Sequence, residues 1–294
     1  MDDFESWASE EIVQLRQGTQ RRRPSPYQSL FRYIGLSNKT SWDMLERTLQ
    51  KSELLGATAH SLNDPYELSP VRFDDLSTRT VPRPPSINRL SRQTPEKEVD
   101  DHARVETART QAHEFLDGKI KAARIVAFCQ QSQSPLLWSH YANSYKGACL
   151  HFLARAFPRR SPGIVTYSRS RPIYPLSLAA ALFRQGAPNR PPIEKDRVLQ
   201  AESDQLLFFN KSEDWSYECE VRLVFDSRRE THIQFNPDGL ASIIIGPRMP
   251  PEDEQRVREM VRRSPNPHLP VRRARLSSTT FSVEMDEAVG LRPA

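Results

Sequence analysis

The predicted fold depends on residues 217–225, which read Tyr217-Glu218-Cys219-Glu220-Val221-Arg222-Leu223-Val224-Phe225. This run alternates with period two, which predicts a strand because successive side chains point to opposite faces. Glu218, Glu220 and Arg222 then share one face. Two neighbouring carboxylates suit contact with a ribose hydroxyl or with positive charge that develops during a reaction, and Arg222 offsets their repulsion. The alternative is an amphipathic strand with a solvated polar face.

Outward from this run, the pattern predicts more strands than helices. The expected strands cover 30–34, 53–58, 124–129, 148–153, 163–167, 217–226, 232–235, 242–246 and one or two segments within 269–284. The expected helices cover 41–51, 101–122, 175–184, 194–209 and 251–263, with Thr40 and Asp43 in a capping box for the first. Because strands and helices do not alternate regularly, we expect an α+β fold with a mixed, antiparallel-rich sheet and flanking helices.

Composition limits the size of the folded part. The chain has 294 residues, 24 prolines, a hydrophobic share of 37% and a net charge of +5. Such a low apolar share predicts segments outside the compact core. We expect a short helix and a basic linker over 1–27, one α+β domain over 28–285, and a poorly ordered insertion over 68–100.

Several classes of protein gain no support from the sequence. The three cysteines form no CxxC pair, and the seven histidines lack metal-ligand spacing, so no metal site is expected. A P-loop, a Gly-rich dinucleotide fingerprint, an HExxH motif and a Gly-x-Ser-x-Gly elbow are also missing. No apolar run is long enough to span a bilayer, and the N-terminus does not resemble a signal peptide. We therefore expect a cytoplasmic protein without a membrane partner.

A second cluster crowds polar tips and aromatic rings into one turn, Trp138-Ser139-His140-Tyr141. Hydroxyls, an imidazole and a stacking face together suit a nicotinamide or another base. The alternative is the start of a helix packed by Trp138 and Tyr141, with a structural His140.

Two further features carry polar groups on apolar or turn segments. Arg32 shares a predicted strand face with Leu30 and Ile34, so it needs an anionic partner if it is buried. That partner is a pyrophosphate, a glutamate of this chain, or water at a sheet edge. Asn63-Asp64-Pro65 predicts a turn. Its carboxylate either binds substrate or has a purely structural role in the turn.

Taken in order, these motifs resemble a bacterial family of uncharacterised domains. The matching elements are Phe31-Arg32-Tyr33, Leu62-Asn63-Asp64-Pro65, Trp138 to Ala142, Lys146-Gly147, Trp215 to Arg222, and Ile245-Gly246. Leu62 departs from the usual Phe, and the 68–100 insertion is specific to this chain. The resemblance covers roughly residues 28–285, and the family is remotely similar to ADP-ribosyltransferases, including DNA-modifying DarT toxins.

That resemblance implies a split sheet that binds NAD as a substrate, in a toxin or a phage-defence effector. It implies that Arg32 holds the pyrophosphate, while Trp138, Ser139, His140 and Tyr141 contact the nicotinamide and its ribose. Glu220 would stabilise the oxocarbenium-like ribose, and Glu218 would orient an acceptor that is a protein or a nucleic acid. The resemblance also assigns Arg222 to the residues that bind the cofactor. We further expect Glu220→Gln to leave folding intact.

Two other functions remain open. A nucleic-acid-binding module or metal-dependent nuclease would use the basic run Arg21–Arg23 and an acidic cluster of Asp64, Glu218 and Glu220. A non-catalytic interaction protein would instead present Glu218, Glu220 and Arg222 as a surface ion network.

Overall fold

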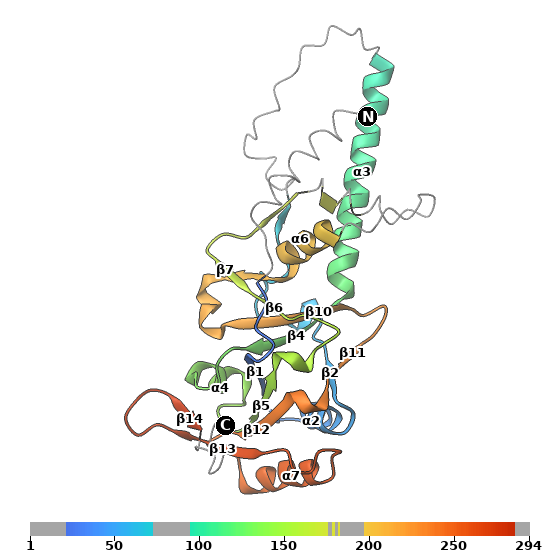
Figure 1. The fold of residues 1–294 in the computed structure, drawn as a ribbon. Helices are drawn as coiled ribbons and strands as arrows, with labels where there is room; N and C mark the ends of the chain where they lie inside the picture. Colours follow the sequence, from blue (N-terminus) through green and yellow to red (C-terminus); the bar gives the residue numbers. More distant parts are fainter. Residues whose placement is uncertain (1–21, 73–94, 176–177, 180–181, 183–196, 286–294) are drawn as a thin grey trace. The chain divides into compact units, whose positions relative to one another are not determined.

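The computed structural model describes residues 22–72, 95–175, 178–179, 182 and 197–285 (Figure 1). The chain divides into two compact units, and each is described by itself. Unit 1 comprises residues 1–21, 59–123 and 166–212, and unit 2 comprises residues 22–58, 124–165 and 213–294. Both units lie within the α+β domain expected over 28–285, apart from the ends of the chain.

Unit 2 is built on an eight-stranded sheet in the order β14-β13-β12-β5-β1-β4-β10-β6. Its strands, in chain order, are β1 (Ser29–Ile34), β4 (Ala123–Cys129), β5 (Ala148–Leu153), β6 (Gly163–Ile164), β10 (Glu220–Asp226), β12 (Leu240–Ile245), β13 (Val271–Leu276) and β14 (Val283–Met285). The β12–β13 pair is parallel, whereas β1–β4, β1–β5, β5–β12, β6–β10 and β13–β14 are antiparallel. The α+β class with a mostly antiparallel sheet is therefore confirmed.

Strand β1 is paired to a different extent with its two neighbours, β5 and β4. Six residues of β1 pair with β5, whereas only Phe31 pairs with β4, opposite Cys129. The pairing between β1 and β4 is thus confined to one residue pair near the middle of β1. This places the rest of β1, including Arg32, beside a strand with which it forms no regular pairing.

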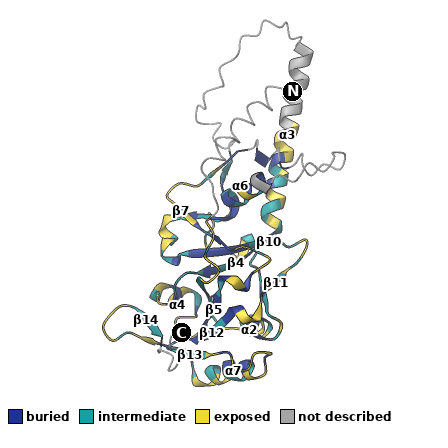
Figure 2. Cartoon of the chain, in the orientation of Figure 1, coloured by how far each residue is buried: buried dark blue, intermediate teal, exposed yellow. Residues whose placement is uncertain are grey.

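Helices cover the two faces of this sheet. Strand β1 places Leu30 and Ile34 in a core with α2 (Lys39–Lys51) and α7 (Pro251–Arg262). On the other face, Phe31 packs with Trp138 of α4 (Pro135–Tyr141). In Figure 1, α4 and α2 lie on opposite sides of β1 and β5. Figure 2 shows β4, β5, β10 and β12 largely as buried strands.

Helix α2 begins two residues earlier than expected and uses a different cap. Asn38 is the N-cap, its side chain accepts from Ser41 N, and Ser41 Oγ in turn accepts from Asn38 N. The capping box expected from Thr40 and Asp43 is therefore wrong. The helix ends at Lys51, and its C-cap Ser52 lies in the left-handed region. After it, β2 (Glu53–Leu55) pairs with β11 (His232–Gln234).

Among its described residues, unit 1 contains two longer helices and two small parallel strand pairs. Its elements are η1 (Ala59–Ser61), β3 (Val71–Arg72), α3 (Pro95–Ala122), β7 (Thr166–Ser168), β8 (Ile173–Tyr174), α6 (Arg197–Phe208) and β9 (Asn210–Ser212). Strand β3 pairs with β8, and β7 pairs with β9. The expected insertion over 68–100 lies outside the described residues from 73 to 94, and its flanks belong to β3 and α3. The short helix expected within 1–27 also lies outside the described residues, which begin at 22.

No helix among the described residues is long and apolar enough to cross a bilayer.

The sequence expectation for β10 needs correction at its start. Residues 213–218 form a 3-10 helix, η4 (Glu213–Glu218), and β10 begins only at Glu220. Between them Cys219 has a φ of 46°, which breaks the alternation.

Candidate functional site

Helix α4 carries the Trp-Ser-His-Tyr cluster and is fixed by its tryptophan. The Trp138 side chain is fully buried, and its indole Nε1 donates to the carbonyl of Ser132 at 2.7 Å. The ring of Tyr33 meets it edge-on, with centroids 5.2 Å apart. Burial of this kind makes Trp138 the anchor of the helix, and its ring offers no exposed stacking face.

The residues that follow Trp138 face outward. Ser139 and His140 are exposed, and Tyr141 is half-buried. The His140 ring lies 6.3 Å from that of Tyr141 and 6.5 Å from that of Tyr217, which in turn lies 6.1 Å from Trp215. We call these four side chains the aromatic row. They bring α4 and η4 together, although about 75 residues separate the two segments.

Beside the aromatic row lies a buried carboxylate. Glu218 is only 3% exposed, and the Tyr141 hydroxyl donates to its Oε1 at 2.5 Å. Glu218 ends η4, and the left-handed Cys219 then redirects the chain into β10. The alternation predicted that Glu218 and Glu220 lie on the same face of one strand. That prediction is wrong, because Glu218 ends η4 and Glu220 begins β10.

Glu220 is held differently from Glu218. Arg222 Nε donates to its Oε1 at 2.6 Å and Nη2 donates to its Oε2 at 2.8 Å, a bidentate pair. Glu220 is 4% exposed and Arg222 is 0% exposed. Neither the solvated polar strand face nor the surface ion network is therefore present, because these groups are buried.

A turn in unusual conformation follows α4. Asn143, Ser144 and Tyr145 have φ angles of 46°, 52° and 72°, so three consecutive non-glycine residues are left-handed. Each such residue is unfavourable by itself, and such geometry concentrates at functional sites. Tight backbone packing holds the turn, since a Cβ at Gly147 would lie 2.1 Å from the Ile34 carbonyl oxygen. The same packing explains why glycine stands at this position.

Arg32 lies on the opposite face of the sheet from α4. It shares the face of Leu30 and Ile34, and its Nη1 donates to the Ala127 carbonyl at 2.9 Å, beside the short β1–β4 ladder. Burial lowers the pKa of Arg32 to about 10, so it stays protonated at neutral pH. Within the described part of the chain, no carboxylate forms an ion pair with it.

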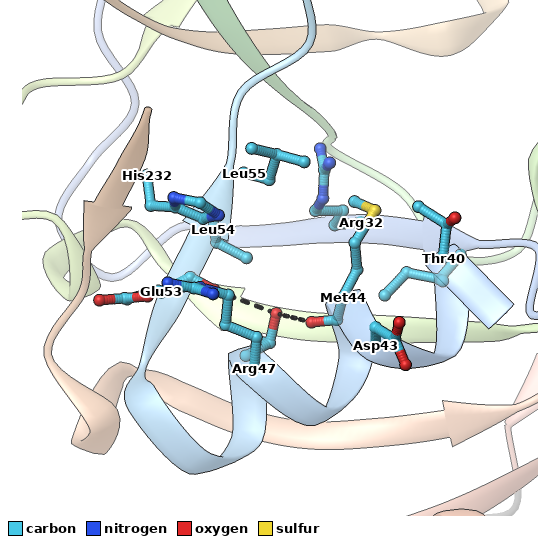
Figure 3. A pocket seen from close by; sticks show the side chains of 11 residues that line it. Arg32, Thr40, Asp43, Met44, Arg47, Glu53, Leu54, Leu55 and His232 are labelled. Atoms are coloured by element: carbon cyan, nitrogen blue, oxygen red, sulfur yellow. Dashed lines mark hydrogen bonds and ion pairs between the residues drawn. The ribbon is translucent and has the colours of Figure 1, made fainter. Parts of the chain in front are cut away.

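Arg32 also lines a cavity of about 180 Å³ between β1, α2 and β2. Figure 3 shows its guanidinium pointing away from Asp43 and Arg47, which lie on α2. Asp43 is paired with Lys39, and Arg47 is paired with Glu53. The structure therefore brings the cluster on α4 together with Glu218, through Tyr141, and places Arg32 on the other face of the sheet.

Sequence reasoning missed two parts of this site. Trp215 and Tyr217 were noted only as motif residues, and their place in the aromatic row depends on the 3-10 turn. The left-handed turn was missed as well, although Lys146-Gly147 and Gly246 marked the region. Among the described residues, no group of three or more His, Cys, Asp or Glu side chains is arranged to hold a metal ion. Asp64, the third acid of the nuclease alternative, belongs to unit 1.

Comparison with known proteins adds no assignment: no family model, no curated protein and no solved structure matches the chain. The resemblance to the bacterial family and to ADP-ribosyltransferases therefore stays a prediction from the motifs.

Proposed function

We propose that the site on α4 and η4 binds NAD and transfers ADP-ribose to an acceptor. The observation that carries this proposal is the hydrogen bond from Tyr141 to the buried Glu218, beside the aromatic row. A buried carboxylate next to partly exposed rings suits a ligand with a flat base and a sugar that develops positive charge. The order of the motifs along the chain supports the same chemistry.

In the proposed reaction, the nicotinamide lies against the aromatic row, near the exposed Ser139 and His140. The bond between ribose C1′ and the nicotinamide nitrogen breaks, and its electron pair leaves with the nicotinamide. Glu218 stabilises the positive charge on the ribose while Tyr141 orients the carboxylate. The acceptor then forms a bond to C1′ and releases a proton to solvent.

This assignment differs from the sequence expectation in the roles of three residues. Glu220 is in a bidentate pair with Arg222, whereas Glu218 bonds to Tyr141 of the aromatic row, so Glu218 is the better placed candidate to meet the developing charge. Arg32 faces the other side of the sheet and takes no part at this site. Trp138 acts through α4, whose position it fixes.

The test is NAD binding by calorimetry together with nicotinamide release for Glu218→Gln. Glutamine keeps the shape and can still accept from Tyr141, so binding should change little. Release should fall by about 10²–10³, the usual effect of losing one preorganised electrostatic contact. The matched control is Glu252→Gln, an exposed glutamate of α7, which should behave as the wild type.

Absence of NAD binding at millimolar concentration would contradict the proposal, and so would equal release by the two variants. A chelator should leave release unchanged, since this reaction uses no metal. Nucleic-acid cleavage that requires magnesium and is abolished by EDTA would favour the nuclease instead.

A further inference from the structure

The Asn63-Asp64-Pro65 motif has no role in the proposed reaction, yet it borders a second cavity. This cavity lies wholly within unit 1 and has a volume of about 220 Å³. Residues 64–67, the segment after β7 and strand β9 form its walls. It brings together three stretches that are distant in sequence and rich in charged and hydroxyl groups.

Asp64 is the most informative residue of its wall. It is 6% exposed, and its Oδ1 accepts from Tyr66 N at 2.8 Å, as in an Asx turn. No other described residue bonds to this carboxylate, so Oδ2 is left without a protein donor while the side chain lines the cavity. This oxygen is open to the cavity, so hydroxyl donors of a ligand can reach it and complete the hydrogen bonding of a largely buried carboxylate.

A buried ion pair lies beside it. Lys211 Nζ is 3.0 Å from Glu67 Oε1, and both side chains are less than 5% exposed. Together with Asp64, the buried wall carries two carboxylates and one ammonium group. Hydrogen-bond donors of a neutral polyol suit such a wall better than another anion does.

The exposed side of the cavity has the opposite character. Ser168, Arg169 and Ser170 are all exposed and line it, so hydroxyls and a guanidinium stand together. Arg171 bonds to the Ser69 carbonyl at 2.7 Å and lies over the Tyr66 ring, 5.9 Å from its centroid. Serine hydroxyls with a guanidinium form a typical phosphate-binding group.

We propose that this cavity binds a phosphorylated sugar of the kind found in nucleotides. The sugar hydroxyls donate to Asp64 on the buried wall, and the phosphate is held by Arg169 and the two serines. The proposal is independent of the NAD reaction, because it uses residues of unit 1 alone.

The experiment is calorimetry on the full chain with ribose 5-phosphate, ribose and inorganic phosphate as separate probes. Ribose 5-phosphate should bind at least about tenfold more tightly than either fragment, since both ends of the cavity contribute. Asp64→Asn keeps the acceptor for Tyr66 N and should weaken ribose 5-phosphate by about tenfold to a hundredfold. Asp238→Asn, an exposed aspartate of unit 2, is the matched control and should bind as the wild type.

Arg169→Gln provides a second variant on an exposed residue, which keeps the test valid if Asp64→Asn fails to fold. It should lower the affinity for ribose 5-phosphate, and the circular dichroism spectrum should show that the protein is still folded. The proposal is overturned if the wild type binds no ribose 5-phosphate at millimolar concentration. It is also overturned if inorganic phosphate binds as tightly as ribose 5-phosphate, or if Arg169→Gln binds as the wild type.

Discussion

The two glutamates of the motif differ in what holds them, and this difference changes how their variants must be read. Glu218 accepts a hydrogen bond from a tyrosine, whereas Glu220 is in a buried bidentate ion pair. Removing one partner of a buried pair leaves the other charge uncompensated. Loss of activity in a Glu220 variant would thus report stability as much as chemistry.

We accordingly expect Glu220→Gln to lower the free energy of unfolding by about 3–5 kcal/mol, because Arg222 loses its counter-charge. Glu218→Gln should cost only about 1 kcal/mol, since the glutamine oxygen still accepts from Tyr141. Urea denaturation followed by circular dichroism measures both. This replaces the sequence-based expectation that Glu220→Gln leaves folding intact.

The double variant Glu220→Met, Arg222→Met provides the control, because it removes both charges and keeps apolar volume. It should be more stable than Glu220→Gln. Equal stability of Glu220→Gln and the wild type would show that the pair contributes nothing to folding.

The loop between α4 and β5 depends on close backbone packing. A Cβ at Gly147 would lie 2.1 Å from the Ile34 carbonyl oxygen and 3.1 Å from Ala142 backbone atoms, and neither is a flexible side chain. The left-handed residues 143–145 lie directly before this glycine. The position of α4 relative to β1 therefore depends on the loop as well as on Trp138.

Gly147→Ala should destabilise the protein by about 1–3 kcal/mol or more, the usual cost of overpacking against atoms that cannot move away. Gly118→Ala is the matched control, because nothing lies within 4 Å of its Cβ position on α3. There alanine should add about 0.5–1 kcal/mol of stability through helix propensity. Thermal and urea unfolding of the two variants decide the point, and equal effects would refute the packing argument.

The chain alternates between its two units, since segments 59–123 and 166–212 of unit 1 interrupt unit 2. Each unit has its own buried residues, such as Leu116 in unit 1 and Leu150 in unit 2, both 0% exposed. Separate cores allow separate local unfolding.

We expect Leu116→Ala to cost about 2–5 kcal/mol and to lower hydrogen-exchange protection mainly in α3 and α6. Leu150→Ala should act mainly on β1, β5 and β12, its neighbours in the sheet. Amide hydrogen exchange read by mass spectrometry separates the two patterns. A uniform loss of protection over all these elements, from either variant, would show a single cooperative unit instead.

Local patterns predicted much of the secondary structure. The sequence predicted β1, β5 and α7 to within a residue at each end. These elements depend on which neighbouring residues are apolar, and that information is local. The start of β10 was wrong because a left-handed Cys219 interrupts an otherwise regular alternation, and no neighbour in sequence signals that conformation.

The sequence by itself thus determined the α+β class, the positions of most strands and helices, and the residue types available for chemistry. Only the tertiary structure decided which of them meet. Arg32 and Tyr33 are neighbours in sequence, yet one faces the α2 side of the sheet and the other meets Trp138 on the α4 side. Tyr141 reaches Glu218 because η4 and α4 converge. Such meetings depend on strand order and on which helix covers which face, and these arise from contacts between segments far apart in the chain.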